Sequence, residues 1–247
     1  MSDGAGKMNV DWTKLTRDPN DPAVFPKMRD ELVNRRKILR DTDPMAYILQ
    51  RVASKSVLDI GIAAHDFRYL NAKDWKHALI ADVASKTLGI DIIEDIVREV
   101  SKKGWNVRCV DATSNIDLGE RFDVVHIGDV IEHVPDPSAL LRFAGRHLSP
   151  NGRIIVTTPN CFALKFLRRL RADHVVVGNF DHVCWISPTN ALELARRTGL
   201  CLDAYVLAGD FRRASRRLKY FRDVTLRRFP EETMFPDYIF EFIRTAE

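Results

Sequence analysis

Short apolar runs and segments of helical periodicity alternate along the middle of the chain. The apolar runs are bounded by polar or turn-forming residues, which is typical of strands buried on both faces of a parallel sheet. These predicted strands occupy residues 55–60, 86–92, 105–110, 122–127 and 152–158. Between them, apolar side chains recur at helical spacing in residues 75–85, 94–103 and 137–148. The alternation predicts an α/β fold with an open, doubly wound, mostly parallel sheet.

The carboxyl-terminal part of the chain continues this pattern with longer gaps. A helix is predicted over residues 188–198, with Ser187 as its amino-terminal cap and Gly199 as its end. A strand is expected at 200–207, and the alternating run YIFEFIR predicts the last strand at 238–244.

The amino-terminal part is more polar and carries two helical patterns, at residues 26–40 and 44–53. We expect residues 1–50 to form a loose arm and an N-terminal helical cap. Residues 51–247 are then expected to form a single domain.

The composition is that of an ordinary globular protein, with 45% hydrophobic and 29% charged residues. No stretch approaches the roughly 18 apolar residues of a membrane-spanning helix, and the polar start of the chain lacks the apolar core of a secretory signal. The four cysteines are scattered without a CxxC pair, which argues against a zinc finger or a disulfide framework. We therefore expect a cytoplasmic protein with no membrane span.

Acidic residues and glycines follow the ends of four predicted strands. They are Asp59 with Gly61, Asp91, Asp111, and Gly128 with Asp129. Because ligands of open α/β sheets bind outside the carboxyl ends of the strands, these residues are expected to share one rim. A carboxylate after the second strand can accept both hydrogens of a ribose diol, whereas an acidic rim disfavours a phosphate. The set predicts a nucleoside cofactor with a cationic end and argues against NAD(P).

Five blocks of sequence contain these residues. The blocks are VLDIG (57–61), LGIDI (88–92), VDA (110–112), FDVVHIGDVIEHVPDP (122–137) and LSPNGRIIVTTPN (148–160). In their order and spacing they resemble the class I S-adenosylmethionine-dependent methyltransferases. The resemblance implies a seven-stranded sheet with an antiparallel last strand, S-adenosyl-L-methionine as the cofactor, and methyl transfer as the activity.

The resemblance also implies a set of cofactor-binding residues. They are Asp59, Gly61, Asp91, Ile92, Asp111, Ala112, Gly128 and Asp129. The first two would lie beneath the methionine moiety, Asp91 would bind the ribose, Asp111 and Ala112 would hold the adenine, and the last two would line the methionine side. Taken alone, Asp59 and Asp91 are better explained as turn residues that cap helices, and it is their combination with the other blocks that favours a cofactor role.

The loop after the first predicted strand departs from the family, whose members usually read D-x-G-x-G-x-G. Ala63 and His65 replace two of these glycines. Alanine is small, whereas His65 brings a bulky side chain into the loop. Because the ribose and adenine motifs are intact, cofactor binding is still expected, and a non-catalytic scaffold of the same fold stays as an alternative.

Two histidines are the predicted catalytic residues. His133 follows Glu132 in VIEHVPDP, a segment similar to that of ubiquinone-pathway and sugar O-methyltransferases, and His182 lies in NFDHVCW (179–185). A hydroxyl loses its proton as it receives a methyl group, and histidine suits the role of base at neutral pH. We therefore predict O-methylation of a small-molecule hydroxyl. A packing role for His133, and a lid formed by His182 with Trp185, are the structural alternatives.

The small-RNA 3′-end ribose methyltransferases resemble the same stretch. In that resemblance Asp129, Glu132, His133 and His182 would form a set of two carboxylates and two imidazoles that could hold Mg²⁺ or another divalent ion. Such a metal would lower the pKa of a hydroxyl and replace a protein base. Since the chain has Asp129 where that family has glutamate, metal-assisted RNA ribose methylation is the alternative, and a site without metal is preferred.

Cationic residues gather in two insertions that we expect on the substrate side, near residues 161–185 and 209–236. They are Lys165, Arg168, Arg169 and Arg171 in the first, and the arginine-rich stretch 212–228 in the second, where Arg212, Arg213, Arg216 and Arg217 recur at helical spacing. A charge run is usually a solvated face, but this one could bind an anionic acceptor or an RNA end. The oligomeric state is left open.

Overall fold

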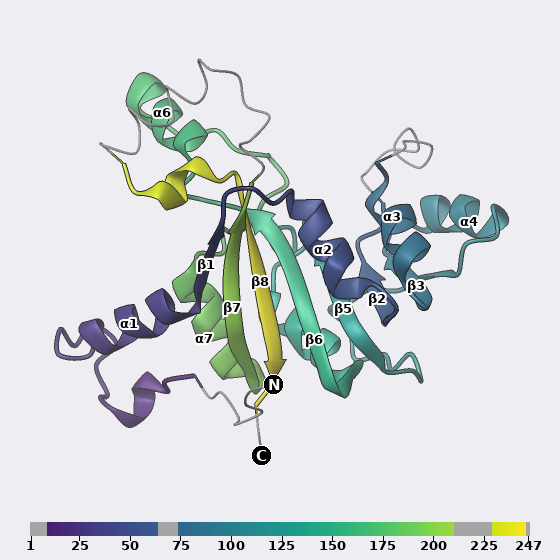
Figure 1. Cartoon of the computed structure of the whole chain (residues 1–247), viewed down its shortest axis with the longest axis horizontal. Helices are drawn as coiled ribbons and strands as arrows, with labels where there is room; N and C mark the ends of the chain where they lie inside the picture. Colours follow the sequence, from purple (N-terminus) through teal and green to yellow (C-terminus); the bar gives the residue numbers. More distant parts are fainter. Residues whose placement is uncertain (1–8, 64–73, 210–228, 246–247) are drawn as a thin grey trace.

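The computed structural model describes residues 9–63, 74–209 and 229–245. Its centre is an eight-stranded sheet with the order β1-β7-β8-β6-β5-β2-β3-β4 (Figure 1). The strands are β1 (Arg36–Leu39), β2 (Ser56–Ile60), β3 (Lys86–Asp91), β4 (Val107–Cys109), β5 (Phe122–Gly128), β6 (Leu148–Pro159), β7 (Leu200–Ala208) and β8 (Asp237–Arg244). Strand β8 runs antiparallel to β6 and β7, and the other paired strands are parallel. The predicted α/β class, the doubly wound parallel sheet and the antiparallel last strand are confirmed.

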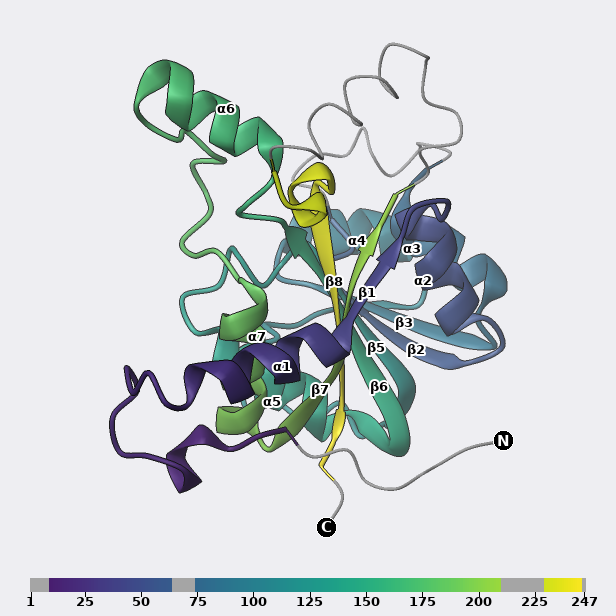
Figure 2. The same cartoon turned by 60° about the vertical axis from the view of Figure 1, so that its left-hand side comes forward.

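Helices cover both faces of the sheet. They are α1 (Phe25–Arg35), α2 (Pro44–Val52), α3 (Lys76–Val83), α4 (Glu94–Lys102), α5 (Pro137–Arg146), α6 (Leu164–Asp173) and α7 (Pro188–Thr198), with short 3₁₀ turns at Trp12–Lys14 and Glu231–Met234. Figure 2 shows α2, α3 and α4 on one side and α1, α5 and α7 on the other. Among the residues that the structure describes, no helix is both long and apolar enough to cross a bilayer.

The continuous apolar runs form strands because their alternate side chains enter two different cores. In β2, Val57 packs in the core under α2 and α3, whereas Leu58 and Ile60 pack in the core under α5 and α7. In β6, Ile155 faces the first core and its neighbour Ile154 faces the second. A strand with both faces buried therefore shows no polar alternation, as the sequence predicted.

The predicted helix over residues 26–40 is too long. Helix α1 ends at Arg35, and Arg36–Leu39 form the edge strand β1, which pairs in parallel with β7. Ile38 and Leu39 pack against opposite cores, so pairing and burial at the edge of the sheet override the helical pattern. This strand is added to the predicted seven. It joins part of the expected N-terminal cap to the main sheet, so the domain division at residue 50 stays a prediction.

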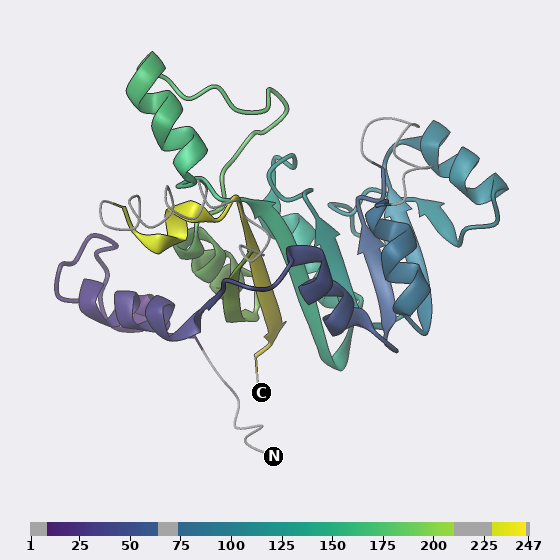
Figure 3. The same ribbon diagram turned by 45° about the horizontal axis from the view of Figure 1, so that its top comes forward.

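The first insertion, expected as a basic segment and a loop, contains helix α6. Figure 3 shows α6 standing away from the sheet, at the end toward which β6 points. Its carboxyl end is marked by His174, which has a positive φ of 57°. Residues 210–228 of the second insertion lie outside the described residues.

Candidate cofactor and acceptor site

A cavity of about 850 Å³ lies at the carboxyl ends of β2, β3, β4 and β5. This volume is within the range of small-molecule sites in proteins. Its lining includes all of the predicted cofactor-binding residues, Asp59, Gly61, Asp91, Ile92, Asp111, Ala112, Gly128 and Asp129, and both predicted catalytic histidines, His133 and His182. The fold thus brings both predicted sets around one cavity, and their individual roles stay predictions.

Gly61 is required by the turn that follows β2. Its φ is +83°, and a Cβ atom there would lie 2.1 Å from Cγ2 of Val130. Both the backbone conformation and the close approach exclude a larger residue. The first glycine of the predicted motif therefore has a structural reason.

Asp91 fixes the start of the same loop. Its carboxylate, 8% exposed, accepts hydrogen bonds from the backbone N–H groups of Ala63 at 2.8 Å and Ile93 at 3.0 Å. The next side chain, Ile92, is 68% exposed on the cavity wall. The loop is thus anchored at Ala63, where the family usually has glycine. His65, the other departure, lies outside the described residues.

Asp111 forms a local turn after β4. Its Oδ1 atom accepts hydrogen bonds from the backbone N–H and the hydroxyl of Thr113, each at 2.7 Å. Ala112 is buried beside it. The carboxylate is exposed and lines the cavity, which is compatible with the predicted contact with an adenine.

The charge of Asp59 is compensated by two neighbouring histidines. It is 3% exposed, and its two oxygens contact Nδ1 of His77 and Nδ1 of His126, each at 2.7 Å. Burial alone would raise its pKa, but the hydrogen bonds and charges of His126 and His77 outweigh burial and hold the pKa of Asp59 well below its ordinary value. The partners of this carboxylate are therefore two imidazoles.

Asp129 lies at the end of β5 with a positive φ of 56°. Its Oδ1 atom accepts a hydrogen bond from the Thr157 hydroxyl at 3.0 Å, and its Oδ2 atom pairs with Lys76 Nζ. Burial would raise the pKa of Asp129, but Lys76 and Thr157 lower it overall. The carboxylate is therefore a fixed negative charge on the cavity wall.

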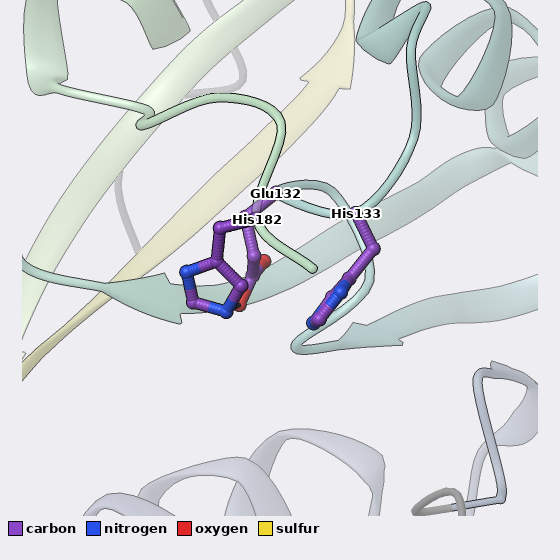
Figure 4. Close-up of side chains that lie close together, drawn as sticks. All are labelled: Glu132, His133 and His182. Atoms are coloured by element: carbon purple, nitrogen blue, oxygen red, sulfur yellow. Dashed lines mark ion pairs between the residues drawn. The ribbon is translucent and has the colours of Figure 1, made fainter. Parts of the chain in front are cut away.

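Glu132, His133 and His182 form a cluster in the lining of the same cavity, which we call the Glu-His cluster (Figure 4). Each offers one nitrogen or oxygen atom, and these atoms lie within 4.8 Å of one another. The two imidazole rings meet edge to face at 4.7 Å between centroids, and His182 Nε2 lies 4.0 Å from Glu132 Oε1.

The backbone joins the two segments that carry this cluster. The carbonyl of Glu132 accepts a hydrogen bond from the backbone N–H of Val183 at 2.9 Å. On the side-chain level, His133 Nδ1 lies 3.1 Å from Asp181 Oδ2. The segment with His182 is thus held against the loop that follows β5, although about fifty residues separate them in sequence.

The environment of the Glu-His cluster shifts two of its pKa values, that of Glu132 upward toward neutral pH and that of His182 downward. Burial raises the pKa of Glu132 to about 7, and the negative charges of Asp129 and Asp237 add to this effect. Burial and the neighbouring His133 lower the pKa of His182. The sequence predicted a metal-ligand role or a turn hydrogen bond for Glu132, and its raised pKa makes it a candidate for proton transfer as well.

Three of the four predicted metal ligands converge in this cluster. Asp129 is outside the group of converging ligand atoms and is engaged by Lys76 and Thr157. One carboxylate with two imidazoles is a donor set that suits Zn²⁺ or a related transition metal better than Mg²⁺, which prefers oxygen ligands.

The predicted cationic residues of the first insertion are exposed on α6 and the residues near it. They are Lys165, Arg168, Arg169 and Arg171. Burial is the main cause that lowers the pKa of His182, and the charge of Lys165 adds a smaller contribution. The arginine-rich stretch 212–228 lies outside the described residues.

The chain matches the family model described as methyltransferase domain over residues 32–205, which is more than half of its length. It therefore belongs to this methyltransferase domain family, and its sheet has the class I methyltransferase fold. This membership supports S-adenosyl-L-methionine, the cofactor expected from the sequence.

Similar proteins include ubiquinone biosynthesis O-methyltransferases. That of Aeromonas salmonicida is 24% identical over 151 residues, which cover 59% of this chain and 63% of the relative. That of Aliivibrio fischeri is 26% identical over 200 residues, which cover 73% and 83%. The matched part of this chain thus spans less than two thirds of the Aeromonas protein.

Two solved structures share the fold. An S-adenosylmethionine-dependent methyltransferase from Mesorhizobium loti has a TM-score of 0.51 and 16% identity, and the match covers 81% of this chain and 97% of that one. A methyltransferase from Archaeoglobus fulgidus has a TM-score of 0.51 and 20% identity, with 79% and 89% covered.

Proposed function

We propose that this protein methylates a hydroxyl group of a small-molecule acceptor. The observation that carries the proposal is the Glu-His cluster, which lines the same cavity as the predicted nucleoside-binding residues. An oxygen acceptor must lose its proton as it is methylated, and this cluster offers groups that exchange protons near neutral pH. The similar ubiquinone biosynthesis O-methyltransferases support an oxygen acceptor.

The donor groups around the cavity fit the cofactor. Asp91 and Asp111 provide carboxylates for a nucleoside, and Gly61 lets the backbone approach where a Cβ atom would clash. The bound cofactor supplies an electrophilic methyl group on a sulfonium sulfur. Positioning the acceptor oxygen in line with that methyl group is expected to contribute much of the rate.

We assign the role of base to His182. Its lowered pKa keeps the imidazole neutral at pH 7, so that it can accept the proton of the acceptor hydroxyl. Glu132, 4.0 Å from Nε2 of His182, stabilises the positive charge that the imidazole gains. His133 packs edge to face on His182 and is oriented by Asp181, so it positions the base.

Product analysis tests this proposal. The purified protein is incubated with S-adenosylmethionine and separate sets of phenols, catechols, sugars and sugar phosphates, and the methylated atom is identified by NMR. We expect O-methyl products that the His182→Gln variant forms much more slowly. Methylation at nitrogen or carbon only, or equal rates for the variant and the unchanged protein, contradicts the proposal.

A metal-assisted reaction on an RNA ribose is the second candidate. It is supported by the three ligand atoms that lie within 4.8 Å of one another. Binding of Zn²⁺, Mn²⁺ and Mg²⁺ is measured by calorimetry on the metal-stripped protein and on Glu132→Gln. Metal-dependent methylation of RNA together with salt-sensitive RNA binding supports this candidate. An activity that is indifferent to a chelator rejects it.

A further inference from the structure

Three consecutive residues at the start of α3 contact three different parts of the cavity wall. The indole N–H of Trp75 donates a hydrogen bond to the carbonyl of Ile62 at 2.9 Å, and His77 contacts Asp59. Between these two buried side chains, Lys76 projects into the cavity lining, with its side chain 51% exposed. The start of α3 is therefore fixed on both sides of one accessible lysine.

The packing around Trp75 makes this arrangement rigid. Its ring meets Trp105 edge to face at 5.0 Å and lies 5.2 Å from the His77 ring. Trp75 and His77 are both less than 9% exposed. They restrict where the backbone of Lys76 can lie, and only its side-chain torsions stay adjustable.

The charged partner of Lys76 is equally well placed. Asp129 pairs with Lys76 Nζ, and its side chain is 40% exposed. Its orientation is set by the hydrogen bond from Thr157 and by the positive φ of its backbone. Lys76 and Asp129 thus present opposite charges, side by side, on the wall formed by α3 and the end of β5.

The cofactor has a complementary pair of charges. The amino-acid end of S-adenosylmethionine carries an α-carboxylate and an α-ammonium group. With its nucleoside toward Asp91 at the end of β3 and Asp111 after β4, this end extends toward the start of α3 and the end of β5, where Lys76 and Asp129 lie. A zwitterion can contact both residues with opposite charges facing each other.

We infer that Lys76 binds the α-carboxylate of the methionine moiety and that Asp129 accepts a hydrogen bond from its α-ammonium group. Trp75 and His77 are positioning residues for Lys76. A side chain at the start of α3 then provides a contact with the cofactor beside a loop in which the usual glycines are replaced. This role for Lys76 depends on cofactor binding and not on the identity of the acceptor.

Calorimetry with matched ligands tests this inference. S-adenosylhomocysteine carries the whole amino-acid end, decarboxylated S-adenosylmethionine keeps only the ammonium group, and 5′-methylthioadenosine lacks both. We expect Lys76→Met to lower the affinity for S-adenosylhomocysteine by about 10- to 100-fold, as for loss of a charge-assisted hydrogen bond. The other two ligands should change by no more than about threefold, and Lys76→Arg should restore most of the lost affinity.

Lys86→Met is the matched control. Lys86 also pairs with a carboxylate, that of Glu120, and its side chain is 56% exposed, but it does not line the cavity. Its substitution should leave the affinity for all three ligands unchanged. Equal weakening of all three ligands by Lys76→Met would show a general disturbance of the site, and unchanged binding of S-adenosylhomocysteine would show no contact. Either result overturns the inference.

Discussion

Asp59 and Glu132 are both buried carboxylates beside the same cavity, yet their surroundings shift their pKa values in opposite directions. Asp59, at the end of β2, has an imidazole within hydrogen-bond distance of each oxygen. Glu132, in the loop after β5, accepts a hydrogen bond from Thr158, and Nε2 of His182 lies 4.0 Å from its Oε1 atom. The two imidazoles therefore compensate the charge of Asp59, whereas burial disfavours the charged form of Glu132.

In the proposed assignment, this difference distinguishes the cofactor side of the cavity, near Asp59, from the acceptor side, near Glu132. On the cofactor side, a compensated carboxylate joins β2, β5 and α3 without changing its protonation near neutral pH. On the acceptor side, Glu132 has a pKa of about 7 and can respond to a proton released nearby. Two carboxylates whose environments push their pKa values apart are a recurring feature of sites for proton transfer.

The largest expected effect comes from the acceptor side. His182→Gln should lower kcat by about 10²- to 10⁴-fold, because a base is removed. The affinity for S-adenosylhomocysteine should stay within about threefold, since the predicted cofactor contacts are made by other residues of the cavity. Steady-state kinetics and calorimetry measure both. His174→Gln, at the exposed carboxyl end of α6, is the control. A fall in cofactor affinity that matches the fall in kcat would contradict the assignment of His182 to the acceptor side.

On the cofactor side, Asp59→Asn should reduce the free energy of unfolding by about 2–4 kcal/mol at pH 7, because two buried imidazoles lose their charged partner. The folded-state pKa of Asp59 is depressed, so its contribution is present above the unfolded-state pKa of about 3.9 and is lost as the pH falls toward the folded-state value. The difference from the unchanged protein should therefore shrink below about pH 4.

Urea denaturation at several pH values measures this difference. Asp82→Asn, on the exposed face of α3, provides the matched control and should change stability little. A variant of Asp59 that is as stable as the unchanged protein at pH 7 would mean that the two histidines do not depend on this carboxylate.

A smaller effect is expected at Asp91. Asp91→Asn should lower the affinity for S-adenosylhomocysteine by about 10- to 100-fold, because an amide offers one acceptor oxygen where the carboxylate offers two. Calorimetry measures the change, and Asp95→Asn, 73% exposed in its side chain, is the control. Unchanged affinity would mean that Asp91 serves only the hydrogen bonds to Ala63 and Ile93.

The parts of the fold that the sequence predicted are those with local signals. The strands of the sheet centre are continuous apolar runs, and the cap of α7 is visible as Ser187 followed by Pro188. Edge strand β1 was missed because its four residues follow a helix without a break, and only pairing with β7 defines it.

In the site, too, contacts between residues far apart in sequence could not be predicted. Strand-end acids could be listed from the sequence, but the partners of Asp59 could not: His77 comes from the helix after the loop, and His126 from a strand 67 residues away. The raised pKa of Glu132 depends on burial and on Asp237, which is brought close only by the antiparallel strand β8. Lys76 has no sequence motif at all, and its position became evident from its contact with Asp129.

The protonation of Glu132 is the most direct test of the contrast between the two sides. The carboxyl carbons of glutamate are labelled with ¹³C, and their chemical shifts are followed by NMR from acidic to alkaline pH. We predict one resonance with a midpoint at about pH 7, absent from the Glu132→Gln variant. A spectrum in which every glutamate titrates below about pH 5, as unperturbed side chains do, would contradict the account.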